Sequence, residues 1–177
     1  MPQAPLLVGM QLDEQLSALI AAAPLPPIDI GTIDRATVER LSTWLKSMPE
    51  LSDGCRAGLW LLAGDLNKSH TISQNMATPE GSFWHGIMHR REGDYDNAKY
   101  WFRRVGSHAV LTSLSEEIIA LAGRDAHGDL PWSQLEVPQT VALALVDASR
   151  DRRSVELVEA MAWIEWQLLF RHCWLAQ

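Results

Sequence analysis

Apolar residues recur at helical spacing along almost the whole chain. In "LDEQLSALIAAA" (residues 12–23) they return about every 3.6 positions, and the run stops at "PLPP", because proline cannot continue a helix. Residues 33–48 place most of their apolar side chains on one side of a helix in the same way. No segment combines strict alternation with turn signals, which is the pattern typical of strands. The pattern therefore predicts an all-α protein.

Polar cap residues and glycines predict where the helices begin and end. Helix starts are expected after Ser52, Asp65, Thr78, Asp94, Ser113, Pro138 and Ser154. Ser113 forms a capping-box pattern with Glu116, and a loop is expected over residues 124–132. We expect a compact bundle of about eight helices in a single domain, residues 1–177. An N-terminal helix and a proline-rich connector, residues 1–33, should pack on it.

Two segments suggest a repeated helical hairpin. "AGDLNKSHTISQNM" and "EGDYDNAKYWFRRV" align without gaps at a separation of 29 residues. In both, a Gly-Asp pair precedes a helix, so that glycine ends one helix and aspartate caps the next.

The second unit resembles a tetratricopeptide-type hairpin. The matches are the small residue Gly86, the turn Gly93-Asp94-Tyr95, and Ala98 with Phe102 on the second helix. The period departs from the usual value of about 34 residues, and only two units are visible. The resemblance covers residues 55–106 and implies two stacked hairpins, which in that family bind peptides. The block over residues 84–106 also looks like a signature of a family of small helical proteins.

The charge distribution bears on the class of partner. Fifteen Lys and Arg against 22 Asp and Glu give a net charge of −7, which disfavours nucleic-acid binding. Residues 85–106 hold five basic and three acidic side chains, +2, so the other residues sum to −9. A basic island on an acidic protein indicates a small anionic ligand or an acidic partner surface. Ion pairs with neighbouring helices are the structural alternative.

The compartment is predicted from cysteines and from the absence of targeting patterns. Cys55 and Cys173 lie in apolar surroundings and form no CxxC motif, so we expect buried free thiols in a reducing compartment. The sequence shows neither a signal-peptide pattern nor an apolar run of 18 residues. A cytoplasmic protein without membrane contact is expected.

One helical stripe carries candidate catalytic or metal-binding side chains. His85 and His89 are four residues apart and Glu92 follows at three, so all three share a face. Two imidazoles and a carboxylate at this spacing can bind a divalent metal ion, and His70 on the preceding helix can add a ligand. Two alternatives stay open: a metal-free site with a histidine as proton carrier, or hydrogen-bonded histidines in a hairpin interface.

The next helix adds candidate ligand-binding residues. Asn97, Trp101 and Arg104 share a stripe, with Arg103 beside it and Arg90 on the preceding helix. An aromatic ring beside a guanidinium and an amide can hold a sugar acid or a carboxylate. A solvated helix face is the structural alternative.

Three functions remain compatible with these residues. The first is a His/Arg/Trp-lined pocket for a small anionic metabolite, with acid–base or metal-assisted chemistry as one use of it. The second is a tetratricopeptide-like module that grips an acidic peptide. The third is a buried polar network that fixes helix register. No nucleotide-binding or nucleophile-elbow motif is present, so whether the protein is an enzyme stays open.

The last helix is apolar on more than one side, over "VELVEAMAWIEWQLLFRHCWLA". Such a helix lies at the centre of a core or takes part in self-association. We expect a central position, with a homodimer as the alternative.

Overall fold

The computed structural model describes residues 4–124 and 137–177, and within them the chain forms nine α-helices, one 3₁₀-helix and no strand. Of the predicted loop, only Arg124 lies inside the described residues. The all-α prediction is confirmed. The elements are η1 (Pro5–Leu7), α1 (Glu14–Ala22), α2 (Arg35–Ser47), α3 (Asp53–Leu62), α4 (Leu66–Ser73), α5 (Pro79–Glu92), α6 (Tyr95–Val105), α7 (Ala109–Arg124), α8 (Gln139–Arg150) and α9 (Val155–Leu175).

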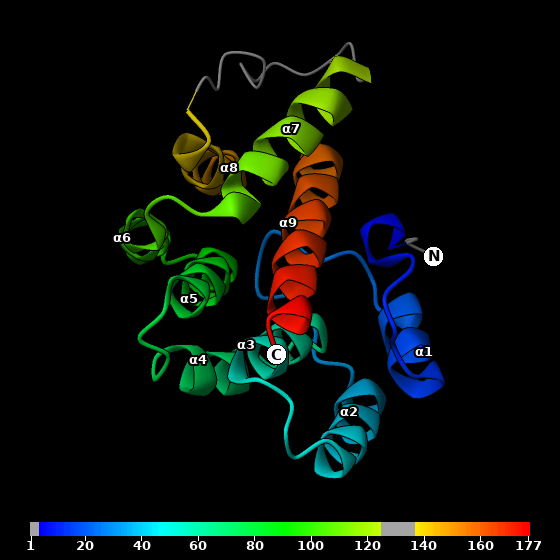
Figure 1. The fold of residues 1–177 in the computed structure, drawn as a ribbon. Coiled ribbons are helices and arrows are strands. Elements are labelled where there is room, and N and C mark those ends of the chain that lie inside the picture. Colours follow the sequence, from blue (N-terminus) through cyan, green and yellow to red (C-terminus); the bar gives the residue numbers. More distant parts are fainter. Residues whose placement is uncertain (1–3, 125–136) are drawn as a thin grey trace.

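Helix α9 lies in the middle of the molecule, with the other helices arranged around it (Figure 1). Met161, Leu169 and Phe170 on this helix are completely buried. Trp166 stacks on Phe170 at a centroid distance of 4.8 Å, and this column of rings forms the centre of the core. The central position expected for the last helix is confirmed. Among the described helices, none has the length and apolar content needed to span a membrane.

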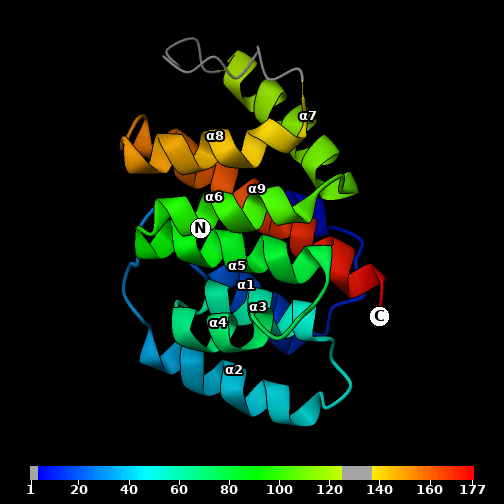
Figure 2. The ribbon, with the colours of Figure 1, turned by 90° about the vertical axis from the view of Figure 1, so that its left-hand side faces the viewer.

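Helix α5 is enclosed on all sides, with every residue from 81 to 91 buried. It lies alongside α6 (Figure 2), and the two helices approach closely at Gly86. A Cβ added at Gly86 would lie 3.1 Å from ring carbons of Phe102, which explains the small residue there. Because α5 is buried all round, its polar side chains must find partners inside the protein.

The same corner joins α3 to α4 and α5 to α6. Gly64 and Gly93 adopt left-handed φ values of +79° and +82°, which glycine reaches without steric cost. The backbone amides of Asp65 and Asp94 then donate to carbonyls five residues earlier, at 2.9 and 3.0 Å. Each aspartate side chain accepts a hydrogen bond from the amide three residues later. Each corner therefore turns the chain back on itself as the Gly-Asp pairs predict.

The predicted starts at Ser52, Asp65, Thr78 and Asp94 are confirmed, each with a side-chain cap. The last helix follows Ser154 as predicted, although the Ser154 side chain makes no cap hydrogen bond.

The start predicted at Ser113 is wrong. Helix α7 begins at Ala109, and Ser113 lies inside it. Its first turn is fixed by His108, whose Nδ1 accepts a hydrogen bond from the Val110 amide at 3.2 Å. An imidazole therefore serves as the cap where the sequence pattern favoured a hydroxyl five residues later.

Candidate functional site

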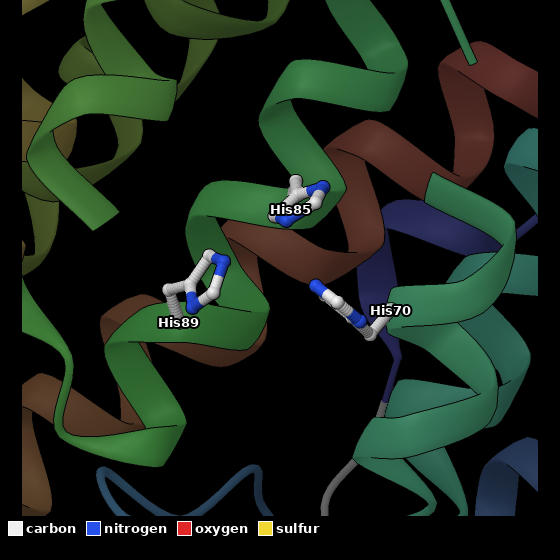
Figure 3. Close-up of side chains that lie close together, drawn as sticks. All are labelled: His70, His85 and His89. Carbon is white, nitrogen blue, oxygen red and sulfur yellow. The ribbon is translucent and has the colours of Figure 1, made fainter. Parts of the chain in front are cut away.

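Three histidines from two helices gather at one place. His70 reaches from α4 toward His85 and His89 on α5 (Figure 3). Each offers one ring nitrogen, and these three nitrogens lie within 4.8 Å of one another. The four-residue spacing on α5 stacks His85 on His89 at a centroid distance of 4.7 Å, and His70 meets His85 edge-on at 4.7 Å. The structure therefore brings together the three imidazoles that the sequence predicted.

Burial lowers the pKa of both imidazoles of α5, which favours their uncharged form. Loss of solvent, followed by the neighbouring His89 and His70, lowers the pKa of His85 to about 4. Burial also lowers the pKa of His89, although Glu92 and Asp94 act in the opposite direction. Neutral imidazoles carry the lone pairs that a metal ion requires.

Glu92 was predicted as a metal ligand, but its carboxylate is not part of the close group formed by His70, His85 and His89. It contacts His89 and orients that ring instead. Its Oε2 is 3.2 Å from Nδ1 of His89. Because a carboxylate only accepts, Nδ1 carries the proton and Nε2 holds the lone pair. The Asn97 amide nitrogen lies 3.1 Å from that Nε2. A carboxylate behind a histidine in this way fixes the tautomer that binds metal through the other nitrogen.

His85 is held between two rings. His89 stacks on it, and Trp101 of α6 is nearly parallel to it at a centroid distance of 4.1 Å. Nδ1 of His85 is buried and has no hydrogen-bond partner among the described residues. Arg104 lies next to Trp101, with its guanidinium carbon 5.3 Å from the centre of the Trp101 ring. Asn97 and Trp101 are half-buried and Arg104 is exposed, so this row runs from the buried histidines to the surface.

The other two predicted arginines lie elsewhere. Arg90 is buried and pairs with Glu165 of α9 through both guanidinium terminal nitrogens. Arg103 is exposed on α6. The structure therefore places neither beside the three histidines.

Both cysteines are buried and free, as predicted. Burial raises the pKa of Cys55 to about 11, and burial together with the nearby Cys55 raises that of Cys173 to about 12. Neither thiol is therefore poised as a nucleophile near neutral pH.

A second cluster, which the sequence pattern did not predict, joins Glu80, His108 and His172. Both imidazoles place Nε2 against the same oxygen of Glu80, at 3.3 and 3.2 Å. Nδ1 of His108 already accepts from a backbone amide, so in the neutral ring the proton resides on Nε2. That nitrogen donates to Glu80 and has no lone pair for a metal ion. The cluster joins the start of α5, the start of α7 and the end of α9 by hydrogen bonds.

The Glu80 cluster predicts an acid-sensitive contact. Partial burial alone raises the pKa of Glu80, but hydrogen bonds from its own amide, Thr78, His108 and His172 outweigh it and lower the pKa to about 2. A depressed folded-state pKa contributes stability above pH 4.5, and this is lost as the pH falls toward 2. We expect Glu80→Gln to lose about 1 kcal/mol of unfolding free energy at pH 7, because the group is partly solvent-screened.

Urea denaturation between pH 2.5 and 7 measures this dependence. The wild type should lose stability relative to Glu80→Gln as the pH falls below 4.5. The neighbouring Cys173 thiol faces Glu80 as well, but it stays neutral across this range. A stability difference that is constant with pH would show that Glu80 contributes nothing through its charge.

The sequence contained a signal for two buried charged residues whose partners it did not identify. Arg91 falls on the apolar stripe of α5 with Ile87 and Met88, so its side chain had to enter the core. Glu165 is a carboxylate inside an apolar stretch of α9. The burial of each side chain could be inferred from its position in the sequence. The partner of each is more than 25 residues distant, so spacing along one helix cannot identify it.

Comparison of the chain with protein-family models, with curated proteins and with solved structures gives no match. The resemblance of residues 55–106 to tetratricopeptide hairpins therefore stays a prediction. The structure does contain two helix pairs, α3–α4 and α5–α6, with the same Gly-Asp corner.

Proposed function

We propose that the protein binds one divalent transition-metal ion through His70, His85 and His89. The observation that carries the proposal is the convergence of three imidazole nitrogens from two helices within 4.8 Å. Imidazole ligands suit zinc, copper, iron and nickel. A site with three histidines leaves a coordination position open for water or a small molecule.

The environment of the histidines supports this assignment. A buried ring nitrogen without a hydrogen-bond partner is costly, and Nδ1 of His85 is such an atom among the described residues. A metal ion bound through this nitrogen would supply the missing partner. Glu92 holds the His89 tautomer with Nε2 unprotonated, and a metal ion there would replace the hydrogen bond from Asn97. The low pKa of His85 leaves it neutral at physiological pH.

A small polar anion is the ligand class we assign to this site. A bound divalent ion supplies a positive charge that attracts an anion and polarises its bonds. Arg104 adds a second positive charge near the surface, at 5.3 Å from the Trp101 ring. Asn97, released from His89, offers an amide to the same ligand. The Glu92 carboxylate is the group that can exchange a proton with this ligand, while His89 holds the ion through Nε2.

The position of Trp101 favours this function over a groove for an acidic peptide. A peptide-binding groove uses aromatic side chains whose faces are free for the ligand. One face of Trp101 is covered by His85, and the side chain is half-buried. The Trp101 ring therefore packs against the histidine cluster and does not offer both faces to a peptide.

Metal content tests the proposal. Purified full-length protein is stripped with a chelator, loaded with zinc chloride, dialysed and analysed for metal. We expect about one zinc ion per chain in the wild type, and at least tenfold less at equal free zinc in His70→Ala, His85→Ala and His89→Ala. His172→Ala is the matched control, because it removes a histidine from the Glu80 cluster instead.

Two outcomes would contradict the proposal. One is a wild type that retains no stoichiometric zinc, cobalt or nickel. The other is loss of metal from His172→Ala with full retention in His85→Ala. The anion is tested separately on cobalt-loaded protein, where phosphate should change the visible absorption of Co²⁺ and Arg104→Ala should weaken that response. An unchanged spectrum at saturating phosphate would remove the anion part alone.

A further inference from the structure

A cavity of about 220 Å³ lies on the opposite face of α5 from the histidines. Arg90 and Arg91 line it, and two residues along a helix correspond to about 200° of rotation, so Arg91 points away from His89. The other walls come from the connector between α1 and α2, the end of α3, and α9. Pro26, Pro27, Ile87, Ala162 and Trp166 make much of the lining apolar.

The two arginines at this cavity differ in how their charge is balanced. Arg90 forms a bidentate pair with the fully buried Glu165, so this pair is neutral overall. Arg91 is 5 % exposed, yet its hydrogen bonds go to backbone carbonyls of Leu61, Ile30 and Asp29. These bonds engage three of its five N–H groups.

Burial of Arg91 without a hydrogen-bonded carboxylate carries an electrostatic cost. Loss of solvent, and then the charge of Arg90, lowers the pKa of Arg91 to about 10, while the Asp29 carboxylate offsets part of this. Asp29 is itself engaged by the exposed Arg152 and by the Gly31 amide. Asp34 is the acidic side chain in the lining, and it is exposed and caps α2. A positive charge at the cavity therefore lacks a buried counter-charge among the described residues.

We propose that this cavity binds a small organic monoanion, a carboxylate on a short apolar body, with Arg91 as its anchor. The carboxylate would accept hydrogen bonds from the remaining N–H groups of Arg91, since planar carboxylates match the guanidinium fork. The apolar body would lie against the prolines, Ile87 and Trp166. Small-molecule sites commonly have volumes of about 300 Å³ or more. Because this cavity is smaller, it should select a short acid. This site is independent of the metal site of the proposed function.

Titration calorimetry with straight-chain acids tests the proposal. Full-length protein is titrated with acetate, butyrate, hexanoate and octanoate, and with hexanamide as the uncharged counterpart of hexanoate. We expect saturable 1:1 binding of at least one acid, and binding of hexanamide at least tenfold weaker than that of hexanoate. Arg91→Gln should weaken hexanoate binding at least tenfold.

Three further variants keep the test decisive. Arg91 also donates hydrogen bonds to three backbone carbonyls, so Arg91→Gln can fail to fold. Ala162→Leu keeps the arginine and fills the cavity, and it should therefore abolish binding. Arg103→Gln removes an exposed arginine of α6 and should bind like the wild type. His85→Ala should also retain hexanoate binding, which separates this site from the metal site. Absence of saturable binding for all four acids, equal binding of hexanamide, or undiminished binding by Ala162→Leu would overturn the proposal.

Discussion

Replacing Glu165 with leucine should lower the free energy of unfolding by about 3–5 kcal/mol. Glu165 is fully buried and pairs with both terminal nitrogens of Arg90, which is 2 % exposed. Removing the carboxylate leaves a guanidinium that cannot lose its charge in the core. Urea denaturation at pH 7 measures the loss.

The reverse variant should cost less and depend on pH. In Arg90→Met, the buried Glu165 can take up a proton, since burial raises its pKa. Folding of this variant therefore binds a proton, and its stability should rise as the pH falls from 7. The double variant Arg90→Met with Glu165→Leu should recover most of the loss, because a buried pair replaced by apolar side chains is often neutral.

A surface pair provides the control for this experiment. Lys99 and Asp147 lie 2.6 Å apart, but the Asp147 side chain is 42 % exposed. Asp147→Ala should therefore cost less than about 1 kcal/mol. If Glu165→Leu cost no more than Asp147→Ala, the buried pair would contribute no more than a surface pair.

Zinc should stabilise the protein by about 4 kcal/mol when its free concentration is a thousand times the dissociation constant. The reason is that the three imidazoles converge only in the folded chain, so the ion binds the native state in preference to the unfolded one. Urea denaturation with buffered zinc and with chelator measures the increment as a shift of the midpoint.

The histidine variants identify where that increment arises. His85→Ala should lose it, whatever the variant's stability without metal, because the measured quantity is the difference between the two conditions. His172→Ala should retain it. An equal zinc response in wild type and His85→Ala would place the stabilising ion elsewhere on the protein.

The helix limits could largely be predicted from local chemistry. A glycine and an aspartate in sequence specify a corner by themselves, and both predicted corners are present. Helix α7 was mispredicted because a hydroxyl three residues before a glutamate is also common inside helices. The real cap, His108, acts through an imidazole nitrogen that sequence rules do not treat as a cap.

The candidate site could be predicted only where its residues share one helix or lie on adjacent helices. His85 and His89 follow from helical spacing, and His70 from the neighbouring hairpin. The direction of Arg90 could not be predicted, because its partner Glu165 is 75 positions away. The Glu80 cluster combines residues up to 92 positions apart, which no periodicity relates. Which charges neutralise each other is decided by tertiary packing.

The three imidazoles belong to two different hairpins, with His70 on the first and His85 and His89 on the second. An ion shared by them would act as a removable crosslink across the 15-residue step from His70 to His85. By analogy with a disulfide that closes a loop of this length, such a tether restricts the unfolded chain by about 3 kcal/mol. Availability of the ion would then govern how firmly α4 is held against α5, so that proteolysis between them would report the metal supply.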